Sequence, residues 1–285
     1  MYKNKSKIIK LTVIFLLLIS LFIWIIWGNK ALKITEYEIS SHMLPKEFDG
    51  FRIVQVSDLH NTEFGENNSR LLEMLKESDP DIIVITGDLI DSRNTDTDIA
   101  LSFVKEAIEI APCYFVTGNH EANTEEYKDL KKDMISLGVH VLENESVSIT
   151  YSGAKISLIG VDDPFLQKND NGDDSYEIMD KVLEDISIDR SSFSVLLSHR
   201  PEHFEIYAKH KIDLVLSGHA HGGQFRIPFI GGVYVPSQGL FPKYDAGLFT
   251  EDSTSMIVSR GIGNSAFPVR INNRPEIVII ELKKA

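Results

Sequence analysis

Short apolar runs that end in aspartate, asparagine or histidine recur along this chain, and they constrain its fold more than any other feature. Each run has the length and composition of a buried strand. Ligands gather beyond the carboxyl ends of the strands in open α/β sheets, so the residues that follow these runs are expected to converge. The five run ends are Asp58–His60, Gly87–Asp88, Gly118–His120, His199 and Gly218–His221.

The last of these blocks carries two histidines. His219 and His221 are two residues apart, and in extended backbone such side chains point to the same side. The flanking Gly218 and Gly222 leave room for a ligand to approach closely. The block therefore predicts two imidazoles that face one point beyond the end of a buried strand.

The order of the expected elements predicts an α/β fold, because strands alternate with helices in the first half of the chain and cluster in the second. This order is typical of a layered sandwich that holds more than one sheet. The expected strands cover residues 31–40, 51–57, 81–86, 113–117, 139–142, 146–151, 155–161, 193–198, 213–217, 256–259 and 276–282. The expected helices lie around residues 71–75, 96–110, 124–138, 175–186 and 201–207.

The N-terminal segment has the pattern of a membrane anchor. Residues 11–27 form an uncharged apolar run that contains Trp24 and Trp27, and four lysines precede it. This length is near the lower limit for crossing a hydrocarbon core of ~30 Å. A cleaved signal peptide is the alternative, but no small-residue cleavage site follows the run. We expect a cytoplasmic tail over 1–10, a single-pass signal anchor over 11–27, a linker and edge strand over 28–47, and one domain over 48–285 on the extracytoplasmic face of the plasma membrane.

The composition excludes two kinds of site. Acidic residues outnumber basic ones by 42 to 29, which gives a formal net charge of −13, so no nucleic-acid partner is expected. Cys113 is the only cysteine, and this rules out an intrachain disulfide and a zinc–thiolate cluster. An acidic chain can still accept a phosphate ester where bound metal ions supply positive charge.

The side chains at the run ends are imidazoles, carboxylates and one amide. This donor set suits hard or borderline divalent ions such as Mn, Fe, Zn or Ni. The number of candidate ligands exceeds what one tetrahedral ion needs. The sequence therefore predicts two divalent ions that share a bridging ligand.

The five blocks together resemble the calcineurin-like metallophosphoesterase superfamily, whose pattern is D-x-H, G-D-x-x-D/N, G-N-H-D/E, a lone H, and G-H-x-H. The resemblance covers residues 51–282, and the glycine- and aromatic-rich segment after the last block is similar to the membrane-anchored bacterial branch. It implies an αββα sandwich of two mixed sheets. It also implies that Asp58, His60 and His221 bind one metal, that Asn119, His199 and His219 bind the second, and that Asp88 bridges both.

The same resemblance places His120 beside the substrate rather than on a metal, where its imidazole could protonate the leaving group. Asp91 and Glu121 would orient ligands or His120 from outside the metal sphere. The expected reaction is hydrolysis of a phosphodiester or pyrophosphate by a metal-bridging hydroxide. Two alternatives stay open: a lipid-linked substrate held at the membrane surface, and a metal-binding scaffold without activity.

The remaining histidines and several arginines are interpreted as surface residues. The histidines are His42, His140, His203 and His210, and the arginines, which could instead contact a phosphate, are Arg93, Arg200, Arg226 and Arg260. The aromatic segment 225–244 predicts either a loop beside the site or core packing. The acidic loop 169–174 misses the spacing of a calcium loop, and it is predicted to be solvated.

Overall fold

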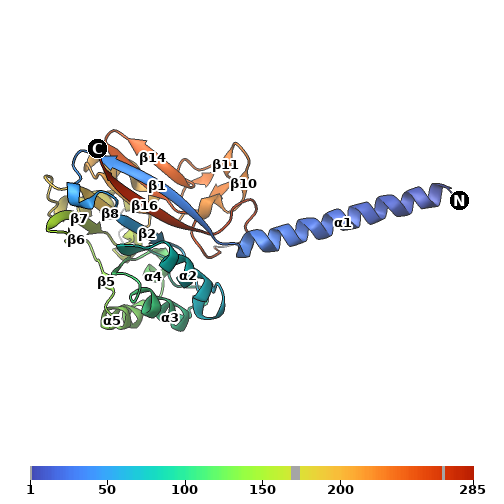
Figure 1. Ribbon diagram of the computed structural model, residues 1–285, viewed down its shortest axis with the longest axis horizontal. Coiled ribbons are helices and arrows are strands. Elements are labelled where there is room, and N and C mark those ends of the chain that lie inside the picture. The colour runs from blue at the N-terminus through green and yellow to red at the C-terminus, as the bar shows by residue number, and fades with distance from the viewer. Residues whose placement is uncertain (1, 168–173, 265–266) are drawn as a thin grey trace.

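The structure is a computed structural model that describes residues 2–167, 174–264 and 267–285. Its first sheet contains β1 (Lys33–Ser41), β2 (Arg52–Val56), β3 (Ile82–Thr86), β4 (Cys113–Val116), β5 (His140–Val141) and β16 (Glu276–Lys284). The strand order is β1-β16-β2-β3-β4-β5, and only β16 and β2 pair in antiparallel fashion. The first and last strands of the chain therefore lie side by side at one edge of the domain (Figure 1).

The second sheet contains β6 (Glu145–Tyr151), β7 (Ala154–Gly160), β8 (Ser194–Leu197), β9 (Leu214–Ser217), β14 (Gly247–Glu251) and β15 (Thr254–Val258). Its order is β14-β15-β9-β8-β7-β6, and the antiparallel pairs are the outermost ones at each edge. The central strands β8 and β9 are buried at every residue. Continuous apolar runs of this kind are typical of parallel strands that are covered on both faces.

Helices cover the outer face of each sheet. The helices α2 (Ser69–Glu77), α3 (Thr97–Ala107) and α5 (Tyr127–Leu137) pack on the first sheet, and α6 (Ser175–Asp185) and α7 (Phe204–Lys209) pack on the second. A third buried apolar cluster lies between the sheets and includes Val84 of β3 and Val195 of β8. The αββα sandwich of two mixed sheets is therefore confirmed.

Local signals in the sequence set several helix ends. The side chain of Asp96 accepts a hydrogen bond from the backbone N–H of Asp98 at the start of α3, and Asp174 caps α6 in the same way. The helix α5 ends at Gly138, whose φ of +100° lies in the left-handed region. Short 3₁₀ helices are η1 (Lys46–Phe48), η2 (Glu66–Asn68), η3 (Pro164–Leu166), η4 (Pro201–His203) and η5 (His221–Gly223).

The structure adds elements that the sequence did not predict. They are the short helix α4 (Asn119–Ala122), the edge strand β14, and the small pairs β10 (Arg226–Ile227) with β11 (Gly231–Gly232) and β12 (Tyr234–Val235) with β13 (Gly239–Leu240). Within the aromatic segment, Val235 and Tyr244 are buried whereas Phe229 and Phe241 are exposed. Neither loop nor core packing therefore describes the whole segment. Of the acidic loop 169–174, residues 169–173 lie outside the described residues.

The interpretation of His203 as a surface residue is wrong. Its side chain is fully buried, and its ring packs edge-on against Tyr176 with the ring centroids 4.5 Å apart. His203 is the last residue of the 3₁₀ helix that Pro201 begins, directly before α7, and its ring also faces Tyr207. His42 and His140 are exposed as expected, and His210 is half-buried and paired with Asp180.

The N-terminal helix α1 (Tyr2–Lys30) is longer than the predicted span of 11–27 and projects away from the domain (Figure 1). Its segment Lys5–Lys30 is long and apolar enough to cross a membrane, with a mean hydropathy of 2.8, and is not covered by the domain. Its last turns contact the domain. The side chain of Asn29 bonds both backbone groups of Arg270, and Arg274 lies 4.8 Å from the ring centroid of Trp27.

A fragment that begins at Ala31 is expected to fold as an independent domain and to hydrolyse small substrates, because every candidate metal ligand and the whole of β1 lie beyond the cut. Circular dichroism, gel filtration and turnover of an aryl phosphate ester check this expectation. A matched fragment that begins at Met43 lacks β1, which pairs with β16 along its whole length. It should aggregate, because an exposed long edge strand is a template for association. Failure of the Ala31 fragment to fold would contradict the boundary.

Candidate metal centre

The predicted site residues come together where the carboxyl ends of both sheets meet. Asp58 and His60 follow β2, Asp88 follows β3, and Asn119 and His120 begin α4 after β4. From the second sheet, His199 follows β8, and both histidines of the last block follow β9. Three strand ends of one sheet and two of the other thus contribute to a single cluster.

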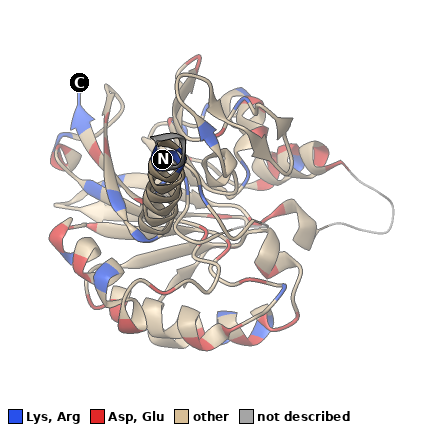
Figure 2. Ribbon diagram, turned by 90° about the vertical axis from the view of Figure 1, so that its right-hand side faces the viewer, with Lys and Arg blue, Asp and Glu red and all other residues tan. Residues whose placement is uncertain are grey.

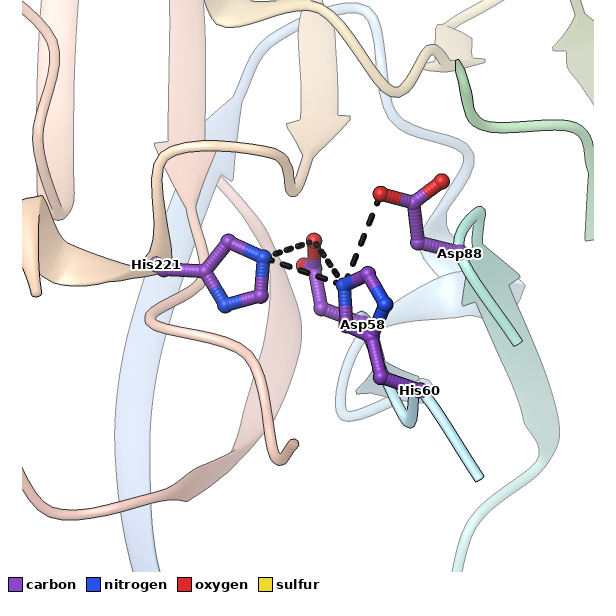
Figure 3. Close-up of side chains that lie close together, drawn as sticks. All are labelled: Asp58, His60, Asp88 and His221. Carbon is purple, nitrogen blue, oxygen red and sulfur yellow. Dashed lines mark hydrogen bonds and ion pairs between the residues drawn. The ribbon is translucent and has the colours of Figure 1, made fainter. Parts of the chain in front are cut away.

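Four of these side chains form the first group of donors. The donor atoms of Asp58, His60, Asp88 and His221 all lie within 4.8 Å of one another. His221 Nε2 lies 3.2 Å from Asp58 Oδ1 and 3.1 Å from His60 Nε2 (Figure 3). Figure 3 also shows His60 pointing toward Asp88, and its Nε2 is 3.6 Å from Asp88 Oδ2.

A second group shares one member with the first. Asp88, His199 and His219 form a further set of three donors. His199 Nε2 lies 3.1 Å from Asp88 Oδ2, the same oxygen that faces His60. It also lies 3.2 Å from His219 Nδ1. Asp88 is therefore placed between the two groups, as a bridging ligand must be.

The two histidines of the last block do not face one point, so this inference from extended backbone is wrong. His219 has a φ of +66° and His221 a φ of +47°, and both therefore lie in the left-handed region. The chain turns sharply at each residue and sends His219 to the second group and His221 to the first. Two histidines that are two residues apart thus contribute to two neighbouring groups of donors.

The loops that carry the candidate ligands contain strained backbone. Left-handed conformations of residues other than glycine are uncommon and cost of order 1 kcal/mol or more each. Here they occur at five of the predicted ligands, namely Asp58, His60, Asp88, His219 and His221. Such strain persists only where the surrounding structure enforces it. The backbone N–H of Asp58 bonds Gly87 O at 3.0 Å, and that of His60 bonds Asp88 O at 3.1 Å, which ties the loops after β2 and β3 together.

Two glycines are required by close packing in the centre. A Cβ atom on Gly87, whose φ is +87°, would lie 2.6 Å from Nδ1 of His199. A Cβ atom on Gly118 would lie 2.3 Å from Oδ1 of Asp88. Both contacts are too short for any side chain, so these positions accept only glycine.

Burial and charge set the protonation of the cluster. Burial would raise the pKa of Asp58, but the neighbouring histidines lower it to about 2, and the pKa of Asp88 is also well below its usual value. Burial lowers the pKa of His60 to about 3 and the pKa of His219 well below its usual value. Burial would lower the pKa of His199 too, but Asp88 and Asp58 raise it to about 10. Four donors are thus deprotonated at neutral pH, as ligands must be, and His199 would release a proton on binding an ion.

Glu121 holds the Asp88 loop from behind. Its buried carboxylate accepts hydrogen bonds from the backbone N–H groups of Asp88, Leu89 and Gly118, each at 2.8 Å, and from that of Ile90 at 3.1 Å. Burial and the nearby Asp88 raise the pKa of Glu121 to about 7, whereas the backbone donors oppose the shift by stabilising the charged form. The residue does not contribute to either group of donors.

His120 has a defined tautomer in its neutral form. Its Nδ1 lies 2.9 Å from the backbone nitrogen of Ser92, which can only donate a hydrogen bond. Nδ1 is therefore the acceptor, and the ring proton lies on Nε2. Asp91 Oδ1 is 3.4 Å from Nδ1, and it also accepts hydrogen bonds from Arg93.

Two buried arginines adjoin the centre, and the interpretation of Arg200 as a surface residue is wrong. Arg200 is held by Asp163, with Nε 2.6 Å from Oδ2, and its Nη1 lies 3.1 Å from His219 Nε2. Arg270 is fully buried and its Nη2 lies 3.3 Å from His221 Nδ1. Because Arg200 directly follows the candidate ligand His199, the sequence could have indicated that it lies near the centre. No sequence pattern marks Arg270.

The other three arginines that were interpreted as surface residues, Arg93, Arg226 and Arg260, differ in exposure. Arg93 is about half exposed and pairs with Asp91, as expected of a surface residue. The side chain of Arg226 is only 16% exposed and pairs with Asp245 at 2.9 Å. The side chain of Arg260 is 25% exposed, so these two arginines are half-buried at the surface of the domain.

A family model described as calcineurin-like phosphoesterase matches residues 51–223, which is more than half of the chain. The chain belongs to the calcineurin-like phosphoesterases. Members of this family hydrolyse phosphoric esters, and the dinuclear metal dependence of the family agrees with a buried Asp/His cluster that could hold metal ions. The apolar helix α1 and relatives named as transmembrane proteins indicate a membrane protein.

Relatives of this calcineurin-like phosphoesterase occur in bacteria and vertebrates. The metallophosphoesterase YkuE of Bacillus subtilis is 33% identical over 88% of this chain and 86% of its own length. The phosphodiesterase YaeI of Escherichia coli is 28% identical over 81% and 82% of the two chains. A transmembrane protein with metallophosphoesterase domain from Bos taurus is 32% identical over 88% of this chain, which spans 57% of that relative. Among solved structures, a dimetal phosphatase from Danio rerio is 13% identical with a TM-score of 0.45, over 75% of this chain and 88% of that one.

The donor atoms of the cluster fit divalent cations. Oδ1 of Asn119 is buried and has no hydrogen-bond partner among the described residues, and an amide oxygen of this kind is a good ligand for a divalent ion. Imidazole nitrogens also meet in pairs, 3.1 Å apart in His60 and His221 and 3.2 Å apart in His199 and His219. A cation between such nitrogens would satisfy their lone pairs at once.

Asp88→Asn should lower metal content and turnover together, because Asp88 is the one carboxylate present in both groups of donors. Loss of a residue outside the ligand sphere commonly costs 10–100-fold, so we expect a loss above ~10²-fold. Elemental analysis and turnover of an aryl phosphodiester measure both effects. Asp133→Asn, on the exposed face of α5, serves as the matched control. Full metal occupancy with normal turnover in Asp88→Asn would contradict a shared ligand.

Proposed function

We propose that this protein is a dinuclear metallophosphoesterase that hydrolyses a phosphodiester or pyrophosphate at the membrane surface. Asp58, His60 and His221 would hold one divalent ion, and Asn119, His199 and His219 the other. The observation that carries this proposal is the position of Asp88 Oδ2, which lies 3.6 Å from His60 Nε2 and 3.1 Å from His199 Nε2. The metals are Mn, Fe, Zn or Ni, as the nitrogen and oxygen donors favour.

Two ions bound side by side would lower the pKa of a water toward ~7 and neutralise charge on the phosphoryl oxygens. Other residues of the chain orient the proposed ligands. His199 donates its Nδ1–H to Thr86 O at 2.8 Å, which directs Nε2 toward Asp88. Glu121 fixes the Asp88 loop through its four backbone hydrogen bonds. The positive charge of the bound ions would thus offset the negative charge of the protein, so that an anionic ester could bind.

His120 is the residue that we assign as general acid. Its ring stands edge-on to His60 with the centroids 4.5 Å apart, which places it beside the centre. The acid form is the imidazolium, which would pass the Nε2 proton to the leaving oxygen and remain as a neutral ring protonated on Nδ1. In that form the Ser92 N–H can no longer donate to Nδ1, and Ser92 Oγ at 3.1 Å and Asp91 Oδ1 at 3.4 Å would accept the Nδ1 proton. A scaffold that only binds metal would have no use for this arrangement.

The location of the centre favours a lipid-linked substrate over a soluble one. Asn29, in the last turn of the apolar helix α1, bonds both the backbone N–H and C=O of Arg270. The guanidinium of Arg270 then reaches His221, a proposed ligand. Arg270 therefore links Asn29, at the end of the helix, to His221 of the metal centre. The lysines ahead of the span favour a cytoplasmic N-terminus, and we assign the domain to the extracytoplasmic face of the plasma membrane.

His120→Ala should keep near-normal metal content and lose turnover, by ~10²–10⁴-fold for a substrate with an alkyl leaving group. A nitrophenyl ester should suffer far less, because its leaving group departs without a proton. Steady-state rates on both esters, with elemental analysis of each variant, measure the effect. Equal losses on both substrates, or loss of an ion, would remove His120 from the acid role. Absence of turnover in the metal-loaded wild type would favour the scaffold alternative.

The full-length protein in vesicles should hydrolyse a lipid-linked pyrophosphate at least ~10-fold faster than a soluble pyrophosphate with the same head group, because the anchor raises the effective concentration of a substrate in the bilayer. The fragment from Ala31 should lose this preference while retaining activity on the soluble ester. Equal rates for the two substrates in the anchored protein would contradict the lipid-linked proposal and leave the metal chemistry intact.

A further inference from the structure

A cavity lined by aromatic and basic side chains lies between the end of α1 and the domain, and none of the candidate metal donors lines it. Its volume is about 170 Å³. The apolar helix forms one wall, and the start of β1, the segment after β15 and the turn before β16 form the other. The lining residues that carry the argument are Trp24, Trp27, Lys33, Arg260, Arg270 and Arg274.

The cavity carries an excess of positive charge. Four basic residues line it, and Glu276 is the carboxylate that pairs with two of them, Lys33 at 2.8 Å and Arg260 at 3.7 Å. Arg274 bonds the backbone carbonyls of residues 31 and 32 instead of an acid. Within the described chain, Arg270 has no carboxylate at ion-pair distance, and its buried Nε has no hydrogen-bond partner. A buried guanidinium with an unused donor needs an anion or water to satisfy it.

The surroundings of the cavity place it at the level of lipid head groups. Trp24 and Trp27 flank it from α1, and tryptophan is enriched at membrane interfaces. Arg260 and Asn272 also border an open groove that carries the fully exposed Phe229. Figure 1 shows β10 and β11, which precede and follow this loop, on the side from which α1 leaves. In the view down α1, Lys and Arg segments lie beside its base (Figure 2).

We propose that this cavity binds the phosphate group of an anionic membrane lipid. The guanidinium groups of Arg260, Arg270 and Arg274 supply charge-assisted hydrogen bonds, and the tryptophans face the glycerol and upper acyl region. The bound lipid would fix the domain against the bilayer beside the base of α1. It is not the substrate, and its binding does not depend on the proposed reaction, because none of the lining residues is a proposed metal ligand.

The chain provides its own probe of this site, since its two tryptophans both line the cavity. Full-length protein in detergent is titrated with short-chain phosphatidylglycerol, with phosphatidylcholine of the same chain length, and with inorganic phosphate, while tryptophan emission is recorded. We expect a saturable change with phosphatidylglycerol and none with phosphatidylcholine. Inorganic phosphate should compete only at much higher concentration, because it lacks the apolar contacts. The Asp88→Asn variant should titrate like the wild type.

Arg260→Gln/Arg274→Gln should weaken phosphatidylglycerol binding at least ~10-fold, since two charge-assisted contacts are lost. Arg70→Gln, an exposed arginine on α2, is the matched control. Because Arg274 lies over Trp27, the double variant is also compared by lipid retention in native mass spectrometry, and its unchanged turnover of a soluble ester reports that it is folded. Equal response to both lipids, or wild-type affinity in the double variant, overturns the proposal. Tight binding of phosphate alone overturns the lipid assignment, and loss of binding in Asp88→Asn would place the lipid in the metal centre.

Discussion

The arrangement of the centre depends on one buried carboxylate that binds no metal in our assignment. Glu121 accepts the N–H groups of Asp88, Leu89 and Ile90 in the bend after β3 and that of Gly118 in the loop after β4. Each of these donors would cost ~1–3 kcal/mol if it were left unsatisfied. This interaction stabilises the left-handed backbone of Asp88, and so places Oδ2 of that residue between the two groups of histidines.

The layered fold explains why ligands so distant in sequence converge. The strands are short and buried on both faces, so the functional residues lie in the loops at their carboxyl ends. The two sheets pack face to face, which brings both sets of loops together. The first sheet supplies Asp58 and Asp88, and the second supplies His199, His219 and His221. The apolar helix α1 ends at the same side, joined to the centre through Asn29 and Arg270.

Much of the fold and of the centre could be predicted from sequence because the signals are local. The candidate ligands lie in the short loops that follow apolar runs, and a helix cap such as Asp96 lies within two residues of its partner. The failures concern burial, which depends on residues far apart in sequence. Arg270 reaches His221 across 49 positions, and the interior places of His203 and Arg200 depend on Tyr176 and Asp163. The left-handed backbone at the ligands could not be predicted from the sequence either, because residues other than glycine disfavour this conformation.

Anomalous diffraction from crystals of the manganese-loaded protein tests whether two ions share Asp88. We expect two peaks on either side of Asp88, ~3.5–4 Å apart. One peak should be surrounded by Asp58, His60 and His221, and the other by Asn119, His199 and His219. A single peak that Asp88 does not contact, or two peaks that do not share it, would contradict a dinuclear centre bridged by Asp88.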